Sequence, residues 1–174
     1  HTVHILPFIN VNFFKKNIYV LLEKLIANIT DKFICVSKGM MNESLMYNIA
    51  PKSKYIVIHS GFDIKKFRNS KKNLKLINFK NLKKTKIITM VGAYAKKKAQ
   101  ELKVKQNILF VGFSKFPEKY IALADLCVMN SIREGLPRVV PQYIAAGKPV
   151  ITSNLPCIEE IIKNSINGFI FHQY

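Results

Sequence analysis

Short apolar runs of strand length alternate along the chain with longer segments in which apolar residues recur at helical spacing. The predicted strands are residues 2–6, 32–36, 54–59, 86–91, 107–113, 125–129 and 150–152, and the predicted helices are residues 18–29, 38 onward, 95–103, 118–123 and 139–146. Several strand runs are apolar on both faces, as in parallel sheets covered by helices on both sides. The pattern therefore predicts an α/β fold built from doubly wound parallel sheets.

Single residues mark where some of these elements begin and end. Ser37 follows an apolar run at the position of a helix N-cap. Gly147 sits where the residue after a helix is expected, and Pro149 blocks continuation of that helix. Ser60 to Asp63 reads as a tight turn around Gly61, because glycine tolerates turn conformations without a Cβ clash.

A lysine-rich polar stretch divides the pattern into two blocks. We predict one domain over residues 1–68, an interdomain linker over 69–85 and a second domain over 86–174. The chain starts at a histidine and not at a methionine, and a predicted strand follows at once, so we expect further sequence upstream.

The composition makes some classes of function less favoured than others. With 28 basic and 10 acidic residues the net charge is +18, which attracts phosphate-bearing partners in general. Nucleic acid is disfavoured as a partner, because only three of the basic residues are arginine, the side chain best suited to base readout. Three widely separated cysteines give no metal or disulfide pattern and fit a reducing cytoplasm, and no apolar stretch has the length of a membrane span.

The loop over residues 130–138 is the candidate position for chemistry, because ligands of open α/β sheets bind beyond the carboxyl ends of strands. Glu134 can accept hydrogen bonds from sugar hydroxyls, and Gly135 lets the backbone approach a ligand. The following helix would direct its positive end toward an anionic group. The alternative is an ordinary strand-to-helix connection with a glutamate facing solvent.

Several motifs occur in a fixed order along the chain. In the second block they are residues 131–137 (SIREGLP), 145–152 (AAGKPVIT), 160–162 (EII) and 167–169 (NGF). In the first block they are residues 1–4, 30–37 and 58–63, followed by Phe67. In their order and register these motifs resemble glycosyltransferase family 4, which has the two-domain GT-B fold. The resemblance implies two Rossmann-like domains, both incomplete here: the C-terminal part of an acceptor domain, then a nucleotide-sugar donor domain.

The resemblance also implies site residues. His4 and Glu134 are the catalytic candidates, although a strand-end histidine can equally be structural, and His1, His59 and His172 are taken as structural. The donor-binding candidates are Glu134, Gly135, Leu136, Pro137, Arg138 and Gln142. Gln142 stands where the family places a second glutamate for the ribose, so it lacks the charge that strengthens such a bond.

The chain departs from the family pattern between Ile88 and Gln106. About one βαβ unit, on the order of 30 residues, is missing there, and with it the basic pair that clamps the donor diphosphate. Lysines 96–98 are a candidate substitute or simply a solvated helix face. Pro156 and Cys157 replace a common glycine pair, and the chain stops at Tyr174, where the family continues. We therefore expect the chain as given to be a poor catalyst.

The implied activity is transfer of a sugar from a nucleotide-diphosphate sugar to an acceptor hydroxyl with retained configuration, without a metal or other cofactor. The implied acceptor is a glycan or lipid-linked glycan, in cell-surface polysaccharide synthesis in the cytoplasm. Phe13 to Lys16 suggests a peripheral contact with anionic lipid at the inner face of the membrane, although a core-facing helix explains the same pattern. The alternatives are a non-catalytic remnant and a basic membrane- or nucleic-acid-binding module.

Overall fold

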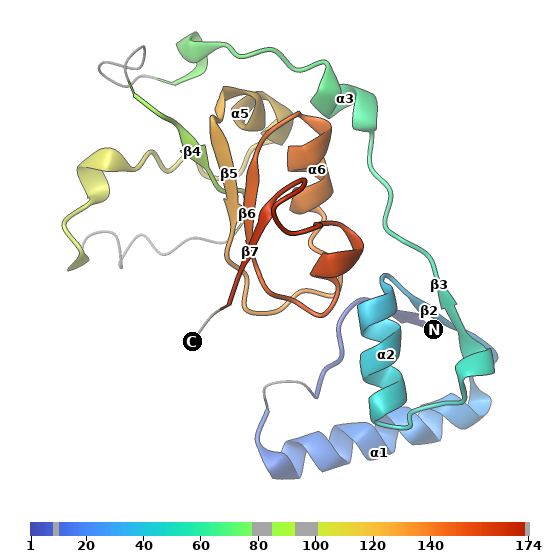
Figure 1. Cartoon of the computed structure of the whole chain (residues 1–174). Helices are drawn as coiled ribbons and strands as arrows, with labels where there is room; N and C mark the ends of the chain where they lie inside the picture. The colour runs from blue at the N-terminus through green and yellow to red at the C-terminus, as the bar shows by residue number, and fades with distance from the viewer. Residues whose placement is uncertain (9–10, 78–84, 93–100, 173–174) are drawn as a thin grey trace.

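The computed structural model describes residues 1–8, 11–77, 85–92 and 101–172, which form two α/β units joined by an extended connection (Figure 1). The first unit contains β1 (Thr2–Val3), α1 (Phe13–Ile29), β2 (Phe33–Cys35), α2 (Lys38–Met46), the short 3₁₀ turn η1 (Lys52–Lys54) and β3 (Tyr55–Val57). Next come α3 (Ile64–Arg68) and η2 (Leu74–Leu76). The second unit contains β4 (Ile88–Thr89), η4 (Lys105–Asn107), α5 (Pro117–Leu123), β5 (Leu126–Met129), α6 (Val139–Ala145), β6 (Val150–Ser153), η5 (Ile158–Glu160) and β7 (Phe169–Phe171).

Both sheets are parallel. The first has the order β1-β2-β3, with Val3 opposite Cys35 and Cys35 opposite Val57. The second has the order β4-β5-β6-β7, with Cys127 opposite Val150. The α/β prediction with parallel sheets is confirmed.

The boundary residues behave as their chemistry predicts. The Ser37 hydroxyl accepts a hydrogen bond from the Met40 N–H at 3.1 Å and so caps α2. After α6, Gly147 adopts a φ of +67°, its N–H bonds to the Ile144 carbonyl, and the Lys148 N–H bonds to the Tyr143 carbonyl. These paired bonds form a Schellman motif, which ends the helix where the glycine and proline predicted.

Some predicted elements differ from the structure, and one lies mostly outside the described residues. The strand expected over residues 2–6 is only two residues long, since its pairing with β2 ends at Val3. The run over 107–113 is no strand, although its residues are described: after η4 it continues as irregular chain. The helix expected over 95–103 lies mostly outside the described residues.

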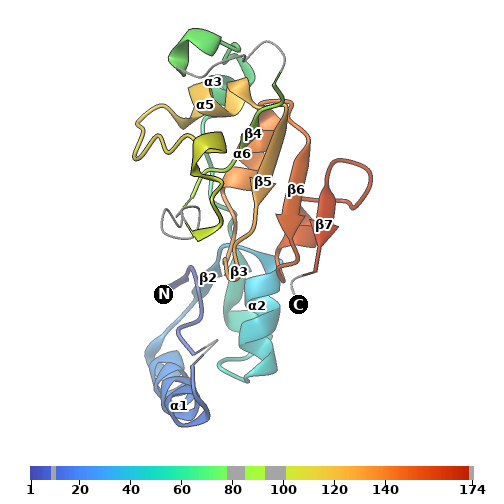
Figure 2. The same ribbon diagram turned by 90° about the vertical axis from the view of Figure 1, so that its left-hand side faces the viewer.

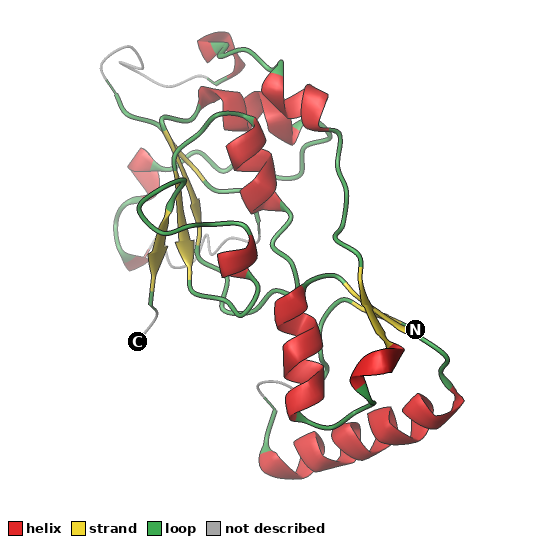
Figure 3. Ribbon diagram, turned by 45° about the vertical axis from the view of Figure 1, so that its right-hand side comes forward, coloured by secondary structure: helices red, strands yellow, loops and turns green. Residues whose placement is uncertain are grey.

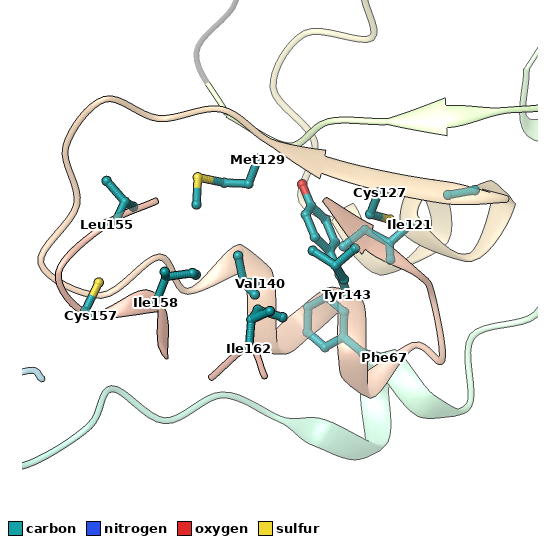
Figure 4. Close-up of a cluster of buried hydrophobic side chains, with 12 residues drawn as sticks. Phe67, Ile121, Cys127, Met129, Val140, Tyr143, Leu155, Cys157, Ile158 and Ile162 are labelled. Atoms are coloured by element: carbon teal, nitrogen blue, oxygen red, sulfur yellow. The ribbon is translucent and has the colours of Figure 1, made fainter. Parts of the chain in front are cut away.

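Each unit has its own apolar core. The core of the second unit gathers side chains from β5, α6, β6 and η5 around Tyr143, Val140 and Ile158, all with no exposed area (Figure 4). In the first unit, Phe8 and Phe33 pack with Met40 of α2. Phe67 of α3 belongs to the core of the second unit, although the sequence assigned it to the first. The domain ranges 1–68, 69–85 and 86–174 themselves stay predictions.

Helix α1 lies along the outer side of the first unit, on the side of α2 away from the second unit (Figure 3). It begins at Phe13, five residues before the predicted start, because the Asn12 side chain caps it by accepting from the Lys15 N–H. Among the described residues, no helix is both long and apolar enough to cross a membrane.

Candidate functional site between the two units

The N-terminal end of α2 meets the second unit at the base of the β5–α6 loop, as Figure 2 shows for the two units together. The Ser37 hydroxyl donates to the Gly135 carbonyl at 2.7 Å, and both residues are buried. The loop over residues 130–138, which the sequence predicts as the position for chemistry, therefore lies where the two units meet.

The loop after β5 is held in place by short polar contacts. The Ser153 hydroxyl at the end of β6 donates to the Ser131 carbonyl at 2.6 Å. The Ser131 hydroxyl in turn donates to the Glu134 carboxylate at 3.1 Å. Glu134 is half-buried, so its carboxylate is oriented and remains accessible.

The two units approach each other so closely at residue 135 that only glycine fits there. A Cβ at this position would overlap the backbone carbonyl of His4, and it would also press on the Met40 methyl group. The carboxyl end of β1, where His4 lies, is thus brought directly against the loop after β5. Strand ends of both sheets converge on one place, as expected for ligand sites of open α/β sheets.

A cleft of about 370 Å³ opens at this convergence. Its lining is His4, Ile5, Val36, Ser60, Glu134, Gly135, Leu136 and Arg138. The first unit and the crossing segment supply half of these residues, and the second unit supplies the other half. The two candidates proposed as catalytic, His4 and Glu134, face the same cleft from opposite units.

Two of the predicted donor-binding residues are not in the lining of this cleft. Pro137 is buried at the start of α6, and Gln142 lies half-buried one turn further along that helix. In contrast, Ile5, Val36 and Ser60 line the cleft and were not predicted from the sequence as site residues. Their positions at strand ends were a usable signal, since Ile5 follows β1, Val36 follows β2 and Ser60 follows β3.

Two arginines lie in the loop after β5. Arg138 is exposed and lines the cleft. Burial raises the pKa of the Glu43 carboxyl of α2, and the nearby Arg133 guanidinium offsets part of that rise. The lysines at 96–98 lie outside the described residues.

Cys157 is a structural neighbour of the cleft. Its thiol donates weakly to the Glu134 carbonyl at 3.7 Å, and burial raises its pKa to about 12. The thiolate is the reactive form of cysteine, so this side chain supports the loop and is no nucleophile near neutral pH. Across the described ranges, no group of three or more histidine, cysteine or acidic residues is arranged to hold a metal ion.

Comparison with known proteins agrees with this architecture. The family model "Glycosyl transferases group 1" matches residues 48–174. Over 72 residues, 41% of this chain and 19% of the relative, the chain is 38% identical to the putative glycosyltransferase EpsD of Bacillus subtilis strain 168.

Solved structures share the fold at low sequence identity. Anabaena HepE in complex with UDP is 15% identical, with a TM-score of 0.77 over 98% of this chain and 57% of HepE. HepE in complex with UDP-glucose gives a TM-score of 0.73 at 15% identity, over 88% of this chain and 54% of HepE. A glycosyltransferase from Rickettsia africae gives a TM-score of 0.66 at 18% identity, over 94% of this chain and 54% of that protein. The chain thus spans little more than half the length of the solved proteins it matches and has their GT-B fold; by its family match, it belongs to the glycosyl transferases of group 1.

Proposed function

We propose that this chain contributes the reaction cleft of a nucleotide-sugar-dependent glycosyltransferase. The observation that carries the proposal is the shared cleft of His4 and Glu134, which come from different units and distant parts of the sequence. A transfer between two substrates suits such a cleft, because each unit can hold one substrate and orient it toward the other.

On the donor side, the Glu134 carboxylate is proposed to accept hydrogen bonds from the sugar hydroxyls. Its contact with Ser131 uses one oxygen at 3.1 Å, which leaves acceptor capacity for a ligand. Gly135 and Leu136 line the cleft beside it, and Arg138 adds a cation for the diphosphate. HepE was solved with UDP and with UDP-glucose, which supports a uridine diphosphate sugar as the first donor to test.

On the acceptor side, His4 is proposed to contact the reacting sugar. The bond between the sugar and the diphosphate breaks, the acceptor oxygen bonds to the same face of the sugar, and the acceptor proton passes to the released diphosphate. Basic side chains and backbone N–H groups neutralise the leaving diphosphate in this proposal, so it includes no metal or other cofactor. We further propose a hexosyl donor and a glycan or lipid-linked glycan acceptor. The proposed setting is cell-surface polysaccharide synthesis at the inner face of the membrane.

The proposed donor affinity is low. Charged hydrogen bonds contribute about 1.5 to 3 kcal/mol each, and the basic pair of the family is absent from its usual place in the sequence. Gln142 adds a neutral amide in place of a carboxylate, and it lies outside the cleft lining.

The test is calorimetric titration of the chain with UDP-glucose and with a guanosine diphosphate sugar, for the wild type and for Glu134→Gln. The matched control is Asp31→Asn, which makes the same change of charge at an exposed position of the first unit, outside the cleft lining. We expect Glu134→Gln to weaken donor binding about tenfold, since a charged hydrogen bond becomes a neutral one. Asp31→Asn should leave it unchanged.

Restoring the family residue gives a second arm of the experiment. Gln142→Glu should strengthen binding of the nucleoside diphosphate if a turn of α6 brings this side chain to the ribose. Absence of donor binding in every variant, the restored one included, would favour the non-catalytic remnant.

A further inference from the structure

The carboxylate of Glu160 crosses the boundary between the two units. It belongs to η5 of the second unit, and both of its oxygens accept backbone hydrogen bonds from the first turn of α2 in the first unit. The Lys38 N–H donates to one oxygen at 3.0 Å, and the Gly39 N–H donates to the other at 2.8 Å. The Glu160 side chain is 18% exposed, although the residue as a whole is exposed, and the bond from Gly39 is partly buried.

This contact completes the cap of α2. The first N–H groups of a helix have no partner within the helix and carry partial positive charge. Ser37 satisfies the Met40 N–H from within the first unit, whereas Lys38 and Gly39 are satisfied from the second unit. The helix start is therefore fully capped only while the two units are together.

Steric fit and charge also favour the contact between α2 and the second unit. A Cβ on Gly39 would overlap the carbonyl of Pro156, so only glycine allows α2 to come this close to the second unit. His59 lies on the segment that crosses between the units, with Nε2 at 3.9 Å from the Glu160 carboxylate and Nδ1 at 3.0 Å from the Val36 carbonyl. The histidine that the sequence analysis took as merely structural is thus part of the contact between the units.

We propose that Glu160 is a positioning residue, which fixes the two units in the arrangement that brings His4 and Glu134 to one cleft. Ser37, the residue before α2, contacts Gly135 in the loop after β5, and the next two residues contact Glu160. The start of one helix in the first unit is therefore fixed at two points of the second unit. Its effect on sugar transfer rests on the proposed function, whereas the contact between the units does not.

The first experiment measures the contact directly. Amide hydrogen exchange and ¹H–¹⁵N spectra of the full chain are compared for the wild type, Glu160→Gln and Glu159→Gln. Glu159→Gln is the matched control, since it changes the same charge on the neighbouring exposed residue. We expect exchange at Lys38 and Gly39 to become about tenfold faster or more in Glu160→Gln, together with shifts of both amide resonances, because one charged acceptor is replaced by a neutral amide. The control should show neither change.

A second variant changes the α2 side of the same contact and keeps the Glu160 carboxylate. Gly39→Ala suits a helix interior but places its methyl group against Pro156. We expect it to separate the units, with a larger radius of gyration in solution scattering and faster exchange at Lys38. Unchanged exchange at Lys38 and Gly39 in Glu160→Gln, or equal changes in Glu159→Gln, would overturn the proposal. So would a Gly39→Ala protein as compact and as protected as the wild type.

A kinetic readout then separates positioning from donor binding. Because the proposed donor contacts lie on the second unit, Glu160→Gln should lower kcat about tenfold and leave the donor KM within about twofold. A rise in donor KM with unchanged kcat would contradict the positioning role. If the chain transfers no sugar at all, the proposed function fails, and the exchange measurements still decide the contact between the units.

Discussion

Helices of the two units differ in how far they are covered. In the second unit, α6 buries Val140 and Tyr143 completely, and α5 buries Ile121 to the same extent. In the first unit, the 17-residue helix α1 has one buried residue, Ala27. Its apolar side chains exposed by more than two fifths are Phe13, Phe14, Ile18, Leu21, Leu22, Leu25, Ile26 and Ile29.

The difference in burial implies a difference in stability between the two units. Burial of apolar area is the dominant favourable term in folding, and a helix that hides little area gains little of it. Both units have an apolar core, but α1, the longest helix of the first unit, adds only Ala27 to the buried side chains there. We expect the first unit to open more readily than the second.

The largest effect on stability is expected in the core of the second unit. Tyr143→Ala removes a buried ring and also the hydroxyl oxygen that accepts from the Val91 N–H at 2.8 Å. We expect a loss of about 3 to 5 kcal/mol in the free energy of unfolding, typical of a large aromatic residue removed from a core. Tyr143→Phe should cost about 1 kcal/mol, the net contribution of one hydrogen bond. Urea unfolding followed by circular dichroism measures both, and Leu25→Ala on the exposed face of α1 is the control. A loss at Leu25 as large as at Tyr143 would contradict the comparison.

A smaller effect distinguishes the units by thiol reactivity. Burial raises the pKa of Cys35 in the first unit to about 11 and that of Cys127 in the second unit to about 12. Because the thiolate reacts, one pKa unit corresponds to roughly tenfold in rate at a fixed pH. Labelling of the native chain at pH 8 with iodoacetamide, read by mass spectrometry, should modify Cys35 faster than Cys127, and local opening of the first unit would widen the gap. Cys157, with its pKa also raised to about 12, should follow Cys127. Faster labelling of Cys127 would show that the second unit is the one that opens.

An acid-sensitive contact in the second unit is expected to have a weaker effect. The pKa of Asp125 is lowered from 3.8 by the Ile87 N–H, at 2.8 Å from the carboxylate, and by Lys72 at 3.2 Å. Because the folded pKa is below the unfolded value, this contribution is fully present above about pH 5 and is lost as the pH falls through the folded pKa. Asp125→Asn should therefore flatten the fall of stability between about pH 5 and pH 2. Asp31→Asn in the first unit serves as the control, and an equal flattening there would refute the assignment.

The smallest expected effect concerns the exposed face of α1. Phe14 is 80% exposed, so Phe14→Ser should change the free energy of unfolding by less than about 0.5 kcal/mol. The same urea titration measures it. A loss of several kcal/mol would mean that this face of α1 is covered in solution.

The sequence by itself determined the local features of this protein. Ser37 caps α2, and Gly147 with Pro149 ends α6, because each of these signals acts on residues no more than about four positions away. The alternation of apolar runs was sufficient for the parallel α/β class. Resemblance to a known family added the candidates that line the cleft, including His4, Glu134 and Arg138.

Only the tertiary structure decided which distant residues meet. The run at 107–113 has the composition of a strand and forms none, because composition alone does not decide which segments pair in a sheet. Gln142 belongs to the same family pattern as Glu134 and yet lies outside the cleft lining, because its position on α6 is set by the packing of that helix. Glu160 reads in the sequence as one more exposed acid of a short motif. It becomes the cap of a helix in the other unit only because folding brings it to residues more than a hundred positions away, where two N–H groups lack partners.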